Sequence, residues 1–172
     1  MPVYYTVDRA GQISADMNYQ LDQFDLSDVP DLAQHFSSHY PMGVSRHGAQ
    51  YLNSKVTAPG GPAVELVWES IRRAHFPHRP SRFTSVFAWQ TLDEAKAFQA
   101  LAQTPAKIWA VEAERGFVAN MSLLNVSTSL LRAMQIAELY WEGHVGPTDI
   151  GLQTPRWEVL LSLPVKALHS VD

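Results

Sequence analysis

Hydrophobic positions along the chain follow two spacings, and each spacing predicts a different kind of element. Apolar residues three and four apart, as in Val64, Val67, Trp68 and Ile71, are typical of an amphipathic helix. Short runs rich in β-branched and aromatic residues are typical of strands. These patterns predict strands at residues 3–7, 83–89, 107–112, 116–121, 157–163 and 165–169, and helices near residues 28–36, 64–71, 92–101 and 130–141.

Signals at the ends of these segments support their boundaries. Pro30 is tolerated in the first turn of a helix, Thr91 and Glu94 have the spacing of a capping box, and Gly143 suits a helix C-terminus. Residues 40–53 show neither spacing and are expected to form a loop. Neither an internal repeat nor a linker-like stretch divides the chain. We therefore expect one α+β domain over residues 1–172.

Composition narrows the class of protein. The chain has 172 residues, of which 46% are hydrophobic and 17% charged, as expected of a packed globular protein. It contains no cysteine, which excludes disulfides, thiolate metal sites and thiol catalysis. No apolar run approaches the roughly 18 residues of a membrane helix, and Met1–Tyr5 lack the features of a secretory signal. We expect a cytoplasmic protein with no membrane partner.

The charge is unevenly distributed. A formal net charge of −4 argues against binding nucleic acid through bulk charge. Residues 16–31 hold five aspartates and neither lysine nor arginine, whereas residues 72–82 hold Arg72, Arg73, Arg79 and Arg82 and no acid. Because the arginine fork suits bidentate capture of phosphate or carboxylate, the second stretch is a candidate anion site. The alternative is a solvated helix end whose cations complement the helix dipole.

Several common sites can be dismissed. Neither glycine-rich phosphate loop is present, and the Gly-x-Ser-x-Gly pattern of serine hydrolases is absent. His35 and His39 have a spacing that could share a metal ion, but no glutamate follows His35 as it does in zinc proteases. We expect two surface histidines there and no metal cofactor.

One acidic residue stands in an unusual place. Glu158 lies at the start of the strongly apolar stretch Trp157–Leu161. Removing a carboxylate from water costs several kcal/mol unless it is partnered. Glu158 is therefore either an ordinary glutamate at a strand edge or a functional residue.

The order of the segments resembles the ADP-ribosyltransferase fold, which has mainly antiparallel sheets with flanking helices. The resemblance rests on the opening strand Tyr4–Arg9, the polar stretch Ser81–Ser85 before a helix, a late helix that ends at Gly143, and the stretch Trp157–Leu160. In that family an opening strand holds the NAD ribose, a middle strand shapes the nicotinamide pocket, and a late strand carries a catalytic glutamate. The resemblance implies that Glu158 is catalytic, with Thr84 and Ser85 as the middle-strand element. Tyr5, Thr6 and Arg9 are the candidates on the opening strand.

The implied chemistry is cleavage of the N-glycosidic bond of NAD through an oxocarbenium-like ribose, which Glu158 would stabilise. The resemblance implies NAD as the substrate and no metal. Ser81 belongs to the stretch that resembles the middle strand. Arg82, with Arg72 or Arg79, could neutralise the diphosphate. Phe87, Tyr140 or Trp141 could form an aromatic wall, although Trp141 shares a stripe with Leu130, Met134 and Ala137 and is expected in the core.

Three hypotheses stay open. The first is an NAD-dependent mono-ADP-ribosyltransferase, such as a toxin, an effector or a phage-encoded modifier, acting on a protein or nucleic-acid acceptor. Arg156 stands where the arginine-modifying branch of the family has Glu or Gln, which leaves nucleobases and other side chains as acceptors. The second is a non-catalytic nucleotide- or nucleic-acid-binding module on the same scaffold. The third is an unrelated α+β interaction protein whose aromatic residues only form its core.

Overall fold

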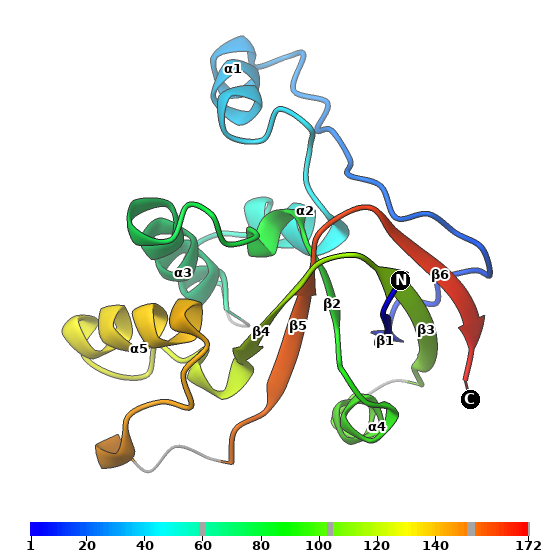
Figure 1. Cartoon of the computed structure of the whole chain (residues 1–172). Coiled ribbons are helices and arrows are strands. Elements are labelled where there is room, and N and C mark those ends of the chain that lie inside the picture. Colours follow the sequence, from blue (N-terminus) through cyan, green and yellow to red (C-terminus); the bar gives the residue numbers. More distant parts are fainter. Residues whose placement is uncertain (59–60, 103–104, 151–153, 172) are drawn as a thin grey trace.

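The computed structural model describes residues 1–58, 61–102, 105–150 and 154–171. Within these ranges it is a mixed α+β structure with two small antiparallel sheets and five α-helices (Figure 1). One sheet has the strand order β1-β3-β6 and is formed by β1 (Val3–Asp8), β3 (Lys107–Ala113) and β6 (Val165–Ser170). The other has the order β2-β5-β4 and is formed by β2 (Val86–Ala88), β5 (Trp157–Leu161) and β4 (Gly116–Asn120).

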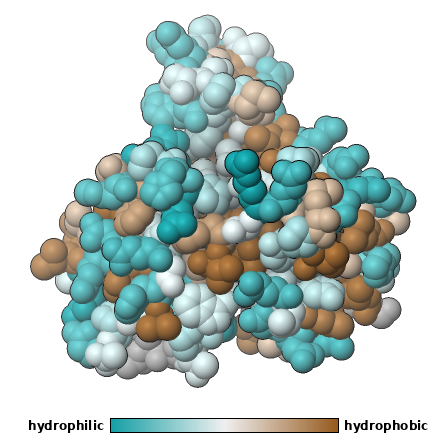
Figure 2. All heavy atoms as spheres, viewed as in Figure 1, coloured by the Kyte–Doolittle hydropathy of each residue, from teal (hydrophilic) through white to brown (hydrophobic). Residues whose placement is uncertain are grey.

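The helices surround the two sheets. They are α1 (Pro30–His39), α2 (Arg46–Leu52), α3 (Pro62–His75), α4 (Leu92–Gln99) and α5 (Leu130–Glu142). Single 3₁₀ turns occur at η1 (Arg82–Thr84), η2 (Met121–Leu123) and η3 (Thr148–Ile150). Helices α3 and α5 pack together beside β4, whereas α4 packs against β1 and β3 (Figure 1). In the space-filling view, hydrophobic residues gather at the centre of this face, below the part of the molecule that α1 occupies (Figure 2).

Strand β5 is buried on both faces, and this orients Glu158. Leu160 packs with Trp68 and Trp141 on the side of α3 and α5. Val159 packs on the opposite side, in a cluster that also contains residues of β3 and β6. Because successive residues of a strand point to opposite faces, Glu158 shares the face of Leu160. Its side chain therefore faces α3 and α5 rather than the other sheet.

The two sheets are joined where β1 meets β2. Tyr5 and Trp89 exchange two backbone hydrogen bonds of 2.9 and 2.8 Å. The Thr6 hydroxyl donates to the backbone carbonyl of Phe87 at 2.7 Å. These contacts hold the opening strand beside the middle strand.

Most of the predicted elements are confirmed, with small shifts at their ends. Helix α4 begins with the complete capping box of Thr91 and Glu94, and α5 ends at Gly143 in the left-handed conformation with φ of 76°. Trp141 is fully buried, as predicted. The predicted stripe on α5 is wrong at two positions, because Leu130 and Met134 are exposed and the buried face runs through Ala133, Ile136, Ala137 and Tyr140.

The strand predicted over residues 83–89 is wrong in its first half. Residues Arg82–Thr84 form the turn η1, and the strand is confined to Val86–Ala88. The Ser81 hydroxyl accepts a hydrogen bond from the Phe83 amide at 3.1 Å, and the Ser85 hydroxyl donates to the Ser81 carbonyl at 2.7 Å. These side-chain bonds stabilise a turn where propensity alone favours a strand.

The loop predicted over residues 40–53 is also wrong, because it contains α2. Ser45 caps this helix by accepting a hydrogen bond from the Gly48 amide at 3.2 Å. The Ser45 amide and hydroxyl both donate to the carbonyl of Phe83, at 2.8 and 3.1 Å. A tertiary contact with η1 therefore stabilises a helix that has no clear apolar periodicity.

Replacing Gly48 by alanine is expected to destabilise the protein, although alanine is the better helix former. A β-carbon at this position would collide with the backbone carbonyl of Phe83. Overpacking of this kind costs about 1–3 kcal/mol, which exceeds the gain of about 1 kcal/mol in helix propensity. Urea unfolding of Gly48→Ala should show the loss. The exposed Gln50→Ala in the same helix is the control, and equal stability of the two variants would contradict the close packing of α2 on η1.

Candidate active site

A cleft of about 1060 Å³ lies beside the junction of the two sheets. It is lined by residues of β1 and the loop after it, of α2 and α3, of the η1–β2 segment, and of the start of β5. The polar residues of its lining include Thr6, Arg9, Arg46, His47, Glu65, Arg82, Ser85 and Glu158. The cleft thus gathers residues from most of the length of the chain.

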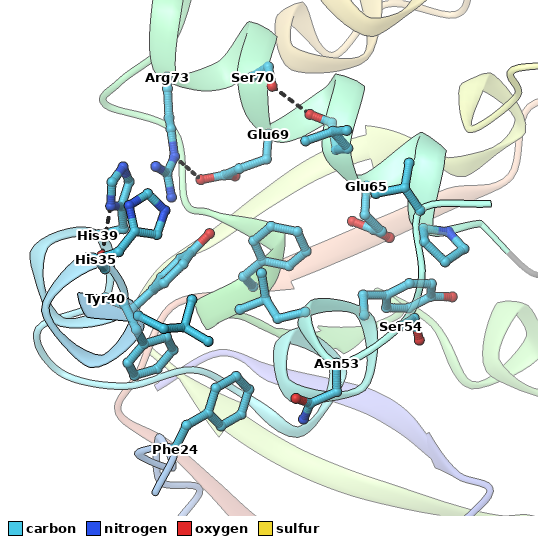
Figure 3. Close-up of a pocket in the computed structure, with 18 of the residues that line it drawn as sticks. Phe24, His35, His39, Tyr40, Asn53, Ser54, Glu65, Glu69, Ser70 and Arg73 are labelled. Carbon is cyan, nitrogen blue, oxygen red and sulfur yellow. Dashed lines mark hydrogen bonds and ion pairs between the residues drawn. The ribbon is translucent and has the colours of Figure 1, made fainter. Parts of the chain in front are cut away.

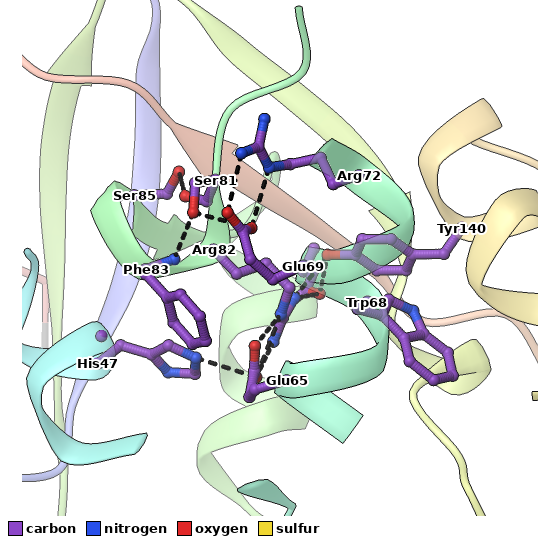
Figure 4. Close-up of polar contacts among 12 residues, drawn as sticks. His47, Glu65, Trp68, Glu69, Arg72, Ser81, Arg82, Phe83, Ser85 and Tyr140 are labelled. Atoms are coloured by element: carbon purple, nitrogen blue, oxygen red, sulfur yellow. Dashed lines mark hydrogen bonds and ion pairs between the residues drawn. The ribbon is translucent and has the colours of Figure 1, made fainter. Parts of the chain in front are cut away.

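Helix α3 places two buried carboxylates one turn apart at this site. Glu65 and Glu69 are 4% and 5% exposed. Glu69 accepts a hydrogen bond from the Ser81 hydroxyl at 3.0 Å, and Glu65 binds the guanidinium of Arg82 (Figure 4). The two glutamates therefore hold the segment that leads into β2.

Arg82 is the centre of a buried polar network. Its Nε and Nη2 donate to the carboxylate of Glu65, with a shortest distance of 2.9 Å. Its Nη1 donates to the Tyr140 hydroxyl at 2.5 Å and to Glu158 Oε1 at 2.6 Å. The guanidinium also lies 4.6 Å from the centre of the Phe87 ring. Four of its five N–H groups are thus used by protein groups.

Glu158 is held through one of its two oxygens. Oε1 accepts hydrogen bonds from Arg82 at 2.6 Å and from the Tyr140 hydroxyl at 2.7 Å. Among the described residues, no hydrogen bond reaches Oε2. The residue is 4% exposed and belongs to the lining of the cleft. Glu158 is thus buried and partnered, as the cost of removing a carboxylate from water requires.

The charges of the network reinforce one another. Burial alone would raise the pKa of Glu65, but Arg82 and His47 outweigh it and lower this pKa to about 2. Burial alone would lower the pKa of Arg82, but Glu158 and Glu65 raise it well above the ordinary value. Burial also raises the pKa of Tyr140, so that its hydroxyl remains a donor to Glu158. The network therefore keeps a charged guanidinium between two carboxylates.

Acid is expected to destabilise the protein through Glu65. A carboxyl whose pKa falls from 4.5 in the unfolded chain to about 2 in the folded one contributes stability that is present above pH 4.5. That contribution, about 3 kcal/mol, is lost as the pH falls toward 2. Urea unfolding at several pH values between 6 and 2 should show a shallower decline for Glu65→Gln than for the wild type. The exposed Glu114→Gln should follow the wild type, and parallel curves for all three proteins would contradict the assignment.

Comparison with known families gives one match. A family model described as a protein of unknown function (DUF2441) matches residues 12–172. The chain belongs to this family. A comparison of this DUF2441 protein with curated proteins found no match.

Six of the ten residues predicted from the sequence line the cleft. They are Thr6, Arg9, Arg82, Ser85, Phe87 and Glu158. Tyr140 lies behind them, bonded to Arg82 and Glu158. Tyr5, Ser81 and Thr84 do not line it: Tyr5 pairs with Trp89, Ser81 bonds Glu69, and the Thr84 hydroxyl contacts the Ser81 carbonyl at 3.4 Å.

The arginine stretch of this DUF2441 protein is largely neutralised from within α3. Arg72 and Arg73 bind Glu69 at 2.8 and 2.9 Å, and Arg79 lies over the Phe117 ring at 4.4 Å. Together with the bonds of Arg82, these contacts place the stretch in the framework of the site. Arg72 and Arg73 lie in the last turn of α3, as the helix-end interpretation predicts, but both are paired with Glu69.

A second, smaller pocket of about 370 Å³ lies among α1, α2 and α3 (Figure 3). Aromatic side chains such as Phe24 and Tyr40 form part of its wall, and Glu69 and Arg73 lie on its α3 side. His35 and His39 meet here with their ring centres 4.4 Å apart. The part of the chain that the structure describes contains no group of three or more His, Asp or Glu residues arranged to hold a metal ion.

Among the polar residues of the cleft lining, the sequence did not predict Glu65 on α3 or Arg46 and His47 on α2. Arg46 is exposed at the cleft and donates to Gln12, and His47 bonds Glu65 at 3.0 Å. Only an isolated pair of basic residues marks Arg46 and His47 in the sequence, inside a segment expected to be a loop.

In the described part of the protein, no helix is long and apolar enough to cross a membrane.

Proposed function

We propose that this protein is an NAD-dependent mono-ADP-ribosyltransferase in which Glu158 is the catalytic residue. The observation that carries the proposal is that, within the described part of the chain, only one of the two carboxylate oxygens of Glu158 is hydrogen-bonded. Oε1 is held by Arg82 and Tyr140, whereas Oε2 receives no hydrogen bond from the described residues, and the residue lines a large cleft. A buried carboxylate fixed through one oxygen leaves the other for a ligand.

The chemistry of NAD cleavage suits such a carboxylate. Breaking the bond between ribose C1′ and nicotinamide places positive charge on the ribose, as in the oxocarbenium-like transition states of glycoside hydrolysis. A fixed negative charge in a site with little water stabilises this charge with little reorganisation. Because Arg82 and Tyr140 hold Oε1 in place, Oε2 could bind a ribose hydroxyl and keep the carboxylate beside C1′.

The cleft also supplies groups for the rest of the dinucleotide. Arg9 and Arg46 line it, and neither forms an ion pair with an acid in the described structure. We assign the diphosphate to these two arginines rather than to Arg82, whose guanidinium already serves Glu65, Glu158 and Tyr140. Phe87 and Ser85 also line the cleft, and we assign them to the nicotinamide end of the dinucleotide.

The arrangement of strands supports an ADP-ribosyltransferase-like fold. Two three-stranded antiparallel sheets meet at the opening and middle strands. Glu158 lies near the start of β5, the central strand of its sheet, beside β2 and β4. The order of an opening strand, a middle strand and a late strand that carries Glu158 is the feature that supports the family resemblance.

The test is whether the full chain cleaves NAD. We expect it to release nicotinamide when incubated with NAD, alone or with a cell lysate as a source of acceptors, and mass spectrometry should detect ADP-ribose or an ADP-ribosylated product. Glu158→Gln should lose this release. Equal silence of both proteins across several lysates would sink the proposal. Binding of unchanged NAD by both would instead favour the non-catalytic nucleotide-binding module.

A further inference from the structure

We propose that His47 is the general base of the same site and accepts the proton of the nucleophile that attacks the ribose. The inference rests on the proposed function and assigns a second catalytic residue to it. It also assigns the acceptor to a chemical class, namely a neutral group that loses a proton on attack, such as a hydroxyl.

The position of His47 is fixed by three neighbours. Its Nε2 lies 3.0 Å from Glu65 Oε1. The ring contacts Tyr51 and Phe87, with ring centres 4.6 and 4.4 Å away. In enzymes that activate a nucleophile, the base is commonly a histidine that a third group, such as a carboxylate, holds in orientation. The side chain is 24% exposed and belongs to the lining of the cleft.

The bond to Glu65 determines which ring nitrogen can accept a proton. Glu65 remains ionised because Arg82 binds it through two nitrogens, so it can only accept a hydrogen bond. Nε2 therefore carries the hydrogen and donates it. In the neutral imidazole the lone pair is then on Nδ1, and no hydrogen bond from the described residues reaches that atom.

His47 and Glu158 are connected by a chain of hydrogen bonds through Glu65 and Arg82. Glu65 accepts from both His47 and Arg82 (Figure 4). Arg82 in turn donates to Glu158. The same guanidinium thus positions the carboxylate for the ribose and, through Glu65, the imidazole for the nucleophile. Both side chains line one cleft, as a reaction between a bound NAD and an incoming acceptor requires.

The proposed step balances. The nucleophile X–H forms a bond from X to ribose C1′, while the bond from C1′ to the nicotinamide nitrogen breaks and its electron pair leaves with neutral nicotinamide. The proton of X–H moves to His47 Nδ1 and then to solvent. The products are the ADP-ribosyl derivative of X, nicotinamide and one proton, and neither an oxidant nor a metal takes part.

The experiment compares water and azide as nucleophiles with the full-length wild type and His47→Gln. The glutamine amide can still donate to Glu65 but has no nitrogen that accepts a proton. With water, nicotinamide release should fall about 100-fold, at the low end of general-base effects. Azide is already an anion and needs no base, so with saturating azide the two proteins should form ADP-ribosyl azide at rates within about threefold of each other. His78→Gln, which removes an exposed histidine, is the control.

Each result decides the question. Equal rates for His47→Gln and the wild type with water overturn the role of His47 and leave the proposed function standing. A variant that is slow with azide as well as with water, while circular dichroism and urea unfolding show a native fold, reduces His47 to a positioning residue and overturns the base assignment. A wild type as silent as Glu158→Gln with both nucleophiles overturns the base assignment and the proposed function together.

Discussion

Replacing Arg82 by methionine is expected to destabilise the protein by about 3–5 kcal/mol, the cost of leaving a buried carboxylate without its partner. The guanidinium is 4% exposed and compensates both Glu65 and Glu158. Methionine fills much of the same space but supplies no donor. Urea unfolding followed by tryptophan fluorescence should show the loss, and the variant should also release no nicotinamide from NAD.

The control for this variant is Arg132→Met. Arg132 forms an ion pair with Asp149 at 2.6 Å, but that carboxylate is 61% exposed. Exposed pairs contribute about 0–1 kcal/mol, so the control should stay close to the wild type. If Arg82→Met and Arg132→Met lost similar stability, the buried network would not be the framework of the site. A second comparison, Arg82→Met combined with Glu65→Gln, should recover part of the loss because one unpartnered charge is removed.

The overall fold was largely predictable because its elements carry strong local signals. The helix around Trp68 has a clear apolar stripe, and the capping box of Thr91 and Glu94 marks the start of α4. The two errors in the assignment of helices and strands, at α2 and η1, occur in segments that stabilise each other. Ser45 donates to the Phe83 carbonyl, and Gly48 is small enough to let the two backbones approach. Contacts of this kind, between residues 38 positions apart, leave no periodic pattern in the sequence.

The site was predictable in part. The desolvation cost of a carboxylate in an apolar strand requires that Glu158 have a partner, and it has two. Which residues they are could not be deduced, because Arg82 lies 76 positions and Tyr140 18 positions away in the sequence. The acids that neutralise the arginine stretch lie outside it, on α3 and β5. Glu69 lies three and four positions before Arg72 and Arg73, a spacing at which helical side chains meet, and this signal was present in the sequence.

Replacing Glu158 by glutamine is expected to lower nicotinamide release by about 100- to 1000-fold, the effect of removing one fixed group that stabilises transition-state charge. Glutamine has nearly the shape of glutamate but no negative charge, so the substitution removes the charge alone. Its amide oxygen can still accept hydrogen bonds from Arg82 and Tyr140 at the positions they now occupy. The loss should therefore fall on kcat, whereas KM for NAD should change little, since the carboxylate acts most strongly on charge that develops as the bond breaks.

The stability of Glu158→Gln separates this role from a structural one. Its urea-unfolding midpoint should stay closer to the wild type than that of Arg82→Met, because no carboxylate is left unpaired. The exposed Glu142→Gln, at the end of α5, should match the wild type in both rate and stability. If Glu158→Gln kept its rate of nicotinamide release within threefold of the wild type, Glu158 would be a partner that neutralises Arg82 in the core, and the acid for NAD cleavage would have to be sought elsewhere. If instead nicotinamide release by Glu158→Gln fell while its KM and stability matched the wild type, Glu158 would act in NAD cleavage. The role of Arg82 would then be to hold the Glu158 carboxylate at the wall of the cleft with one oxygen free.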